Sequence, residues 1–268
     1  MRPPRRASRA SDRAFAIDGA AVVTVGTAIC VASDALAFMT FLVPAVLALR
    51  FLAWFRLPTA ERGIFPSDEM AFFALCLVLG AGNDWNSVVR HRIYGYAVPH
   101  DFPSVSSIPV WMLLYWGMIL RFVATLCRWR RLGPPTCPSD EVRIGGRVVV
   151  SPWLKIAGEL VLVVATRQMI YAYYAHALLS WLPFAGALLV YASVFRLSRH
   201  DRLLLLLAAG AGPAVEVLFI QVGGLHRYHL GWLGGVPLWI VLWWMLAVLV
   251  WNDLSARLLA ARAVAGDA

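Results

Sequence analysis

Charged residues are scarce in this chain of 268 residues, since Asp, Glu, Lys and Arg make up only 15% of it. A typical soluble domain contains about 25%. Lysine occurs once, at Lys155, and 60% of the residues are hydrophobic. A chain with so little charge cannot cover a water-facing surface with polar side chains, so much of its surface must face lipid. The composition therefore excludes an ordinary soluble domain and predicts an integral membrane protein.

The sequence also lacks the motifs by which soluble enzymes hold cofactors or nucleophiles. It has no P-loop, no G-x-S-x-G and no dinucleotide-binding glycine pattern, and its four cysteines form no C-x-x-C pair. Two of the cysteines, Cys30 and Cys76, lie inside apolar runs, which is typical of inert buried thiols. The histidines show no metal-binding spacing. We therefore expect no cofactor and no metal ion.

What the chain does have is a series of long apolar runs. Because a bilayer core needs about 20 helical residues, runs 14–55 and 153–197 each predict two spans, turning near 33–34 and 173–177. Four further spans are expected at 70–89, 107–126, 203–222 and 236–251. The prediction is an all-α, polytopic transmembrane helix bundle of about eight spans in one domain, 14–252, with tails at 1–13 and 253–268. A six-span variant stays open because Asp18, Asp34 and Glu159 fall in the double-length runs.

The net charge of +9 does not point to nucleic acid, because the basic residues sit in short loops between apolar runs. In the eight-span layout 19 of the 24 Lys and Arg residues fall on the side of both termini and three on the other side. Positive loops stay in the cytoplasm, so both termini are expected there. Arginine in place of lysine and abundant Ala and Val suggest a bacterial chain, and hence its inner membrane.

A weak internal repeat relates 14–126 to 153–252, with a cytoplasmic loop at 127–152 between them. Spans three and seven each carry one deep carboxylate, Asp84 and Glu216. The following spans both begin with proline, an apolar residue and tryptophan, at Pro109 and Pro237. Two four-helix units of the same orientation are therefore predicted.

Ionisable groups inside a bilayer are costly, so they indicate function by default. Asp84 and Glu216 are the candidate catalytic residues, as proton donors or acceptors. The candidate substrate-binding residues are polar or aromatic neighbours of these two, together with one deep arginine: Asn83, Trp85, Asn86, Arg167, Gln221, His226 and Tyr228. The alternative for each is a structural hydrogen bond between helices, or a place in the aromatic belt.

The residues from Glu216 onward carry a resemblance to a known family. Gly223-Gly224, Tyr228, the run 235–238 (GVPL) and Trp243 follow the glutamate. This stretch of about 30 residues resembles the carotenoid-biosynthesis membrane family that includes the bacterioruberin-pathway hydratase. The resemblance implies a polytopic protein that acts on long isoprenoid chains inside the bilayer.

Three functions remain open at this point. The first is an enzyme that protonates a lipid or isoprenoid substrate through a carboxyl group, which predicts an opening from the lipid to the polar residues. The second is a small-solute transporter with proton-coupling carboxylates, which predicts a polar route onward to the cytoplasmic side. The third is a non-catalytic assembly protein, which predicts no cavity. The sequence does not specify an oligomeric state or a partner other than the bilayer.

Overall fold

The computed structural model describes residues 11–62, 64–132 and 139–265. The predicted basic tail, 1–13, lies mostly outside this part, as do positions 133–138 of the predicted loop and 266–268. Long helices make up most of the described chain: α1 (Asp12–Ala32), α2 (Leu36–Phe55), α4 (Pro66–Trp85), α5 (Val110–Cys127), α6 (Pro152–Tyr173), α7 (Leu182–Val194), α8 (Arg199–Gln221) and α9 (Leu238–Ala265). Short turns of helix occur at α3 (Thr59–Arg62), at the π-helix η1 (Asn86–Arg90) and at the 3₁₀ helix η2 (Arg130–Leu132).

The eight predicted spans fall on these eight long helices, which confirms the polytopic helix bundle. Six helical stretches in the described chain are long and apolar enough to cross a membrane: α1, α2, α4 with η1, α5, α8 and the part of α9 up to Ala260. The helix α6 has 22 residues but carries Lys155, Glu159 and Arg167, and α7 has only 13 residues. Length and composition alone therefore support six spans directly.

Local sequence explains where the helices begin. Ser11 caps α1 by accepting a hydrogen bond from the Ala14 amide at 3.0 Å, and Ser198 forms a capping box with Asp201 at the start of α8. Ser151 caps α6, and Pro152 takes its first position, where a missing N–H costs nothing. The helix α9 continues past residue 252, where the predicted tail begins, as far as Ala265, because the good helix formers Leu and Ala follow without a break.

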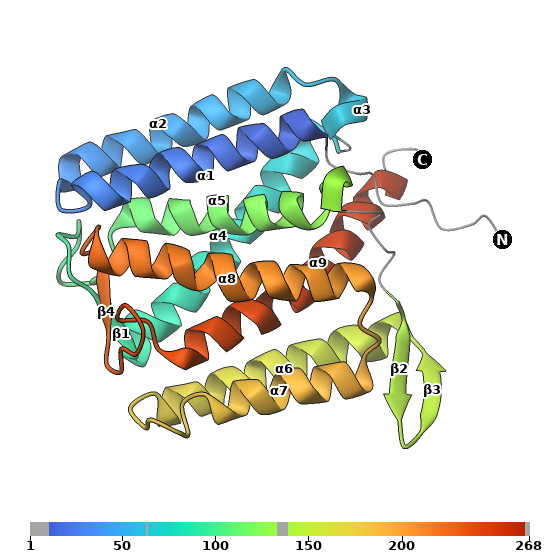
Figure 1. Cartoon of the computed structure of the whole chain (residues 1–268). Coiled ribbons are helices and arrows are strands. Elements are labelled where there is room, and N and C mark those ends of the chain that lie inside the picture. The colour runs from blue at the N-terminus through green and yellow to red at the C-terminus, as the bar shows by residue number, and fades with distance from the viewer. Residues whose placement is uncertain (1–10, 63, 133–138, 266–268) are drawn as a thin grey trace.

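The long helices lie roughly alongside one another, and the described chain begins and ends at the same end of the bundle (Figure 1). We call this the terminal end. Helices α1, α2, α4 and α5 contact one another and share one hydrophobic core, whereas α6, α7, α8 and α9 surround another. The two groups meet where α5 contacts α9 and α1 contacts α8. This division matches the two predicted four-helix units, although whether they are related by duplication stays a prediction.

Two short β-ladders, which the sequence did not predict, complete the fold. Strand β1 (Tyr94–Tyr96) pairs antiparallel with β4 (His226–Tyr228) at the end opposite the termini, which we call the ladder end (Figure 1). Strands β2 (Glu141–Ile144) and β3 (Arg147–Val150) form a hairpin before α6. Its two-residue turn is Gly145-Gly146, with φ of 55° and 78°, values that glycine adopts readily and that suit a hairpin.

Candidate functional site

The β1–β4 ladder surrounds the two deep carboxylates with tyrosine and histidine side chains. Asp84, which is fully buried on α4, accepts hydrogen bonds from the hydroxyl groups of Tyr94 and Tyr96, the latter at 2.8 Å. Glu216, which is buried on α8, lies 2.9 Å from Nε2 of His226 and accepts a hydrogen bond from Tyr228 at 3.3 Å. The ladder thus brings together the two candidate catalytic residues and two of the candidate binding residues in one cluster.

The two carboxylates have partners at the same spacing along the chain. Asp84 precedes its tyrosines by 10 and 12 residues, and Glu216 precedes His226 and Tyr228 by 10 and 12 residues. Across the ladder, Tyr94 lies opposite Tyr228, and Tyr96 lies opposite His226. The loop that follows each carboxylate-bearing helix therefore contributes one strand. The two strands pair about a local two-fold axis at their centre.

The helices around the cluster show the same two-fold correspondence, in a glycine of one helix that contacts a tryptophan of the next. Gly80, four residues before Asp84, lies against Trp116 of α5, and Gly212, four residues before Glu216, lies against Trp244 of α9. The absence of a side chain at each glycine lets the indole approach the helix backbone. The two indole rings stack on each other with centroids 6.3 Å apart. These matched contacts support the predicted repeat beyond the proline–tryptophan pattern.

The aromatic rings of the cluster are closely packed. The ring of Tyr94 lies 5.2 Å from that of Tyr228 and 5.7 Å from that of His226, and Trp239 meets Tyr228 edge-on at 5.6 Å. Burial and the adjacent carboxylates raise the pKa of Tyr94, Tyr96 and Tyr228 well above the ordinary value for a phenol. The three hydroxyl groups therefore stay protonated and act as hydrogen-bond donors to the carboxylates.

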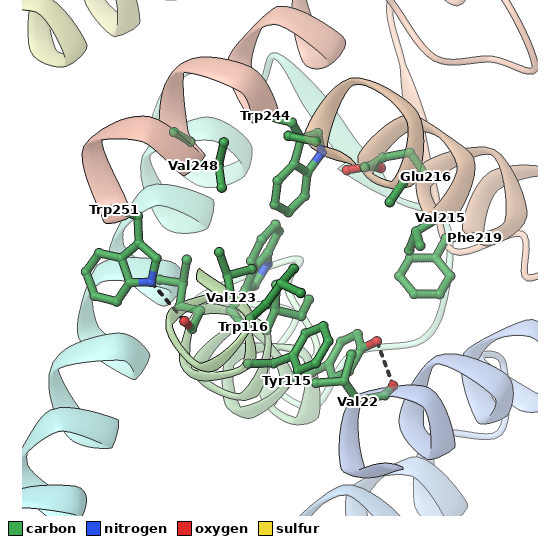
Figure 2. A pocket seen from close by; sticks show the side chains of 18 of the residues that line it. Val22, Tyr115, Trp116, Val123, Val215, Glu216, Phe219, Trp244, Val248 and Trp251 are labelled. Atoms are coloured by element: carbon green, nitrogen blue, oxygen red, sulfur yellow. Dashed lines mark hydrogen bonds between the residues drawn. The ribbon is translucent and has the colours of Figure 1, made fainter. Parts of the chain in front are cut away.

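A cavity of about 260 Å³ begins at this cluster and runs between α1, α5, α8 and α9 (Figure 2). Glu216 and the ladder side chains Tyr94, Tyr96, His226 and Tyr228 line its polar part. The remaining lining is largely apolar and includes Met112, Leu120, Val123, Leu126, Leu204, Leu207, Val248 and Trp251. Asp84 does not line the cavity but lies behind the two tyrosines that it orients.

Two aromatic side chains of the lining donate their polar hydrogens to the backbone. Trp251 donates its indole N–H to the carbonyl of Leu120 at 2.9 Å, and Tyr115 donates its hydroxyl to the carbonyl of Val22 at 3.1 Å (Figure 2). With these groups satisfied, the rings present carbon surface to the cavity. Glu216 is thus an acidic group at one end of an otherwise apolar chamber.

The remaining predicted binding residues do not line this cavity. Trp85 is 41% exposed, and Gln221 is exposed and donates a hydrogen bond to the carbonyl of Gly234. Asn83, Asn86 and Arg167 line a separate groove between α4, η1 and α6. The predicted binding residues therefore do not all line one cavity, because successive residues of a helix point in different directions, and their role in binding stays a prediction. Asn83 and Arg167 also line a small space of about 20 Å³ together with Glu216 and Tyr228.

Sequence reasoning missed four side chains of the cluster: Tyr94, Tyr96, Trp116 and Trp244. The alternation of Tyr94 and Tyr96 was a usable signal, since side chains two apart on a strand share a face. Across the described parts of the chain, no three His, Cys, Asp or Glu side chains are placed to hold a metal ion.

Comparison with known proteins identifies the fold but no family. No model of a protein family and no curated protein matches the chain. The solved structure of a mycobacterial Insig homologue from Mycobacterium vanbaalenii matches with a TM-score of 0.52 and 22% sequence identity. The match covers 75% of this chain and 96% of that chain. At this identity the likeness shows a shared fold and nothing about shared activity.

Proposed function

We propose that this chain binds a lipophilic molecule with a polar end inside the bilayer. The apolar part of the molecule lies in the cavity between α5, α8 and α9, and its polar end meets Glu216, His226 and Tyr228. The observation that supports this proposal is the lining: apolar side chains along most of the cavity and one buried acid at its end. Small-molecule sites commonly combine such apolar walls with a few polar groups that fix orientation.

The same lining favours a lipophilic ligand over a small polar solute. From the ladder toward the terminal end, the described cavity walls consist of residues such as Val123, Leu126, Leu204 and Val248. A proton-coupled transporter needs polar or ionisable groups along its path, because charge is costly in an apolar channel. The cavity lining toward the terminal end consists of apolar side chains and not of such polar groups. Solute transport is therefore a weaker proposal than binding of a lipophilic molecule.

A catalytic role is the second candidate, favoured by the position of Glu216 beside aromatic faces. Trp244 and Glu216 lie along one side of the cavity, and Trp116 of α5 stacks on Trp244 (Figure 2). A protonated Glu216 would give its proton to one carbon of an isoprenoid double bond, and the aromatic faces would stabilise the carbocation. Water would then add its oxygen to the cationic carbon, and the surplus proton would return to the carboxylate, with His226 placed to relay it. The net reaction adds one water.

Binding is tested by filling the cavity. Ala208 lines the cavity, whereas Ala214, on the same helix, is exposed and does not. We expect Ala208→Phe to lower binding of radiolabelled geranylgeraniol by the purified protein at least tenfold, because the new ring occupies the ligand's space. The control Ala214→Phe should bind as the wild type does. Equal binding by all three proteins would contradict the proposal.

Catalysis is tested separately with Glu216→Gln, which keeps the shape and removes the transferable proton. If Glu216 is the acid, the variant should still bind geranylgeraniol but should no longer yield the product one water heavier, as read by mass spectrometry. If the wild type binds the probe and yields no such product, the catalytic proposal fails and the binding proposal stands.

A further inference from the structure

Arg167 is a buried arginine in the ladder-end half of α6. Only 6% of the surface of this residue is exposed to solvent. One terminal nitrogen, Nη2, donates to the hydroxyl of Ser87 at 2.5 Å, and the guanidinium lies 4.7 Å from the ring centre of Trp243 and 5.0 Å from that of Tyr171. Its Nε is buried and has no hydrogen-bond partner among the described residues. Stacking on rings uses no N–H group, so the donors of this cation are largely unused.

No carboxylate in the described part of the chain forms an ion pair with Arg167, which departs from the rule that buried charges are paired. The two nearby carboxylates already have partners, Asp84 in the tyrosines and Glu216 in His226 and Tyr228. Between Arg167 and Glu216 there is a space of only about 20 Å³, room for about one water molecule. A buried cation with one hydrogen bond and two ring contacts lacks the charge partner that buried charges usually have, and an external anion would supply it.

Arg167 lines a groove of about 340 Å³ between α4, η1 and α6. The described lining of this groove contains no carboxylate. Its other nitrogen-bearing polar side chains are Asn83, Asn86, Arg90, His91 and Gln168. The π-turn η1 ends at Arg90, and the next residue, His91, stacks on Tyr171 with ring centres 3.8 Å apart. Burial, together with the charges of Arg90 and Arg167, lowers the pKa of His91, so this ring also meets positive potential.

The position of the groove suits a lipid headgroup. Val163 and Val164 line it, and the exposed face of α6 continues from them through Val161, which is 68% exposed. Arg167 is the sixteenth residue of α6, so it lies roughly 22 Å from the start of the helix. The candidate membrane span formed by α4 and η1 ends at Arg90, which also lines the groove, so the groove lies near the end of a span, where headgroups are found.

We propose that this groove is a binding site for the anionic headgroup of a membrane lipid. Arg167 and Arg90 contact the phosphate, the amides of Asn83, Asn86 and Gln168 donate further hydrogen bonds, and the acyl chains lie along the valines of α6. Guanidinium groups bind phosphate through paired N–H donors, which matches the unused donors of Arg167. The groove is separate from the apolar cavity, so this site does not depend on the function proposed above.

Native mass spectrometry of the purified full-length protein tests the site. The protein is titrated with phosphatidylglycerol or phosphatidylcholine of identical acyl chains, and the two dissociation constants are compared. We expect the wild type to prefer phosphatidylglycerol about tenfold, Arg167→Gln to lose this preference, and Arg167→Lys to keep part of it. Arg227→Gln is the matched control, since Arg227 is an exposed arginine at the ladder end outside the groove.

A second variant keeps the proposal testable if Arg167→Gln does not fold. Arg90 is exposed, so Arg90→Gln should fold normally and should lower the preference for phosphatidylglycerol several-fold. An unchanged preference in Arg90→Gln, or in a folded Arg167→Gln, would overturn the proposal. Titration with inorganic phosphate distinguishes a lipid headgroup from free phosphate as the ligand. If the protein binds phosphate in a manner that needs Arg167 but shows no preference between the two lipids, the assignment to a lipid is overturned.

Discussion

At the scale of single residues, several charges buried in the described part of the bundle have partners on neighbouring helices. Near the terminal end, Glu69 of α4 lies 2.5 Å from Nη2 of Arg50 and 2.8 Å from Nη2 of Arg121. Asp18 of α1 accepts a hydrogen bond from Arg50 at 2.7 Å and completes a neutral set of two acids and two arginines. All four are nearly inaccessible to solvent. Asp18, one of the charges that left a six-span layout open, is thus compensated by neighbouring helices.

Removing one charge from this set should destabilise the fold strongly. We expect Glu69→Gln to lower the free energy of unfolding by about 3–5 kcal/mol, because it leaves two buried guanidinium groups with a single carboxylate. The measurement is denaturant-induced unfolding of the detergent-solubilised protein.

The control for this measurement is Glu61→Gln. Glu61 pairs at 3.4 Å with Arg13, whose side chain is 73% exposed, and such a surface pair contributes at most about 1 kcal/mol. Similar decreases in the free energy of unfolding for Glu61→Gln and Glu69→Gln would show that the buried set of charges does not stabilise the terminal end more than a surface ion pair does.

At the scale of the elements, the sequence predicts the helices well and the ladder not at all. Apolar runs longer than 18 residues have few alternatives in a bilayer, so the turn at Ser33 and the placement of α5 and α8 follow from hydropathy alone. The strand pair depends on two loops more than 120 residues apart meeting in one register. Asp84 and Glu216 could therefore be selected as buried acids, whereas their tyrosine partners could not be assigned.

The contact between α4 and α5 depends on Gly80. A Cβ at this position would lie 2.8 Å from Cβ of Trp116 and 3.3 Å from its backbone carbon, distances at which the helices must move apart. We expect Gly80→Ala to lower the thermal midpoint of unfolding by several degrees and to disturb the Trp116–Trp244 stack, visible in the near-ultraviolet circular dichroism of the indoles. An overpacked contact typically costs about 1–3 kcal/mol.

The same helix contains the control. A Cβ at Gly82 would meet nothing within 4 Å, and alanine is the better helix former, so Gly82→Ala should be neutral or stabilising by up to about 1 kcal/mol. A Gly80→Ala protein as stable as Gly82→Ala would mean that the two helices do not depend on this close approach.

At the scale of the whole molecule, two four-helix groups face each other across the cavity and share the ladder at one end. The carboxylates, their ring partners, the glycines and the tryptophans occur once in each group at matched spacing. The groups differ in detail: Asp84 lies behind its tyrosines, whereas Glu216 reaches the cavity. If the halves arose by duplication, they have since diverged, so that one acid orients the ladder and the other lines the cavity.

The arrangement of the ends leads to a prediction about topology. Helix α1 begins and α9 ends at the same end of the bundle, where most of the basic residues of the described loops also lie (Figure 1). Because positive loops are retained in the cytoplasm, we expect this end to face the cytoplasm and the β1–β4 ladder to face the outside.

Alkaline phosphatase, which is active only outside the bacterial cytoplasm, should be inactive when fused after Ala268 and active when inserted after Ser104, in the loop between β1 and α5. Both fusions must be shown by immunoblot to accumulate equally. Activity at Ala268 would mean an odd number of crossings or the opposite orientation.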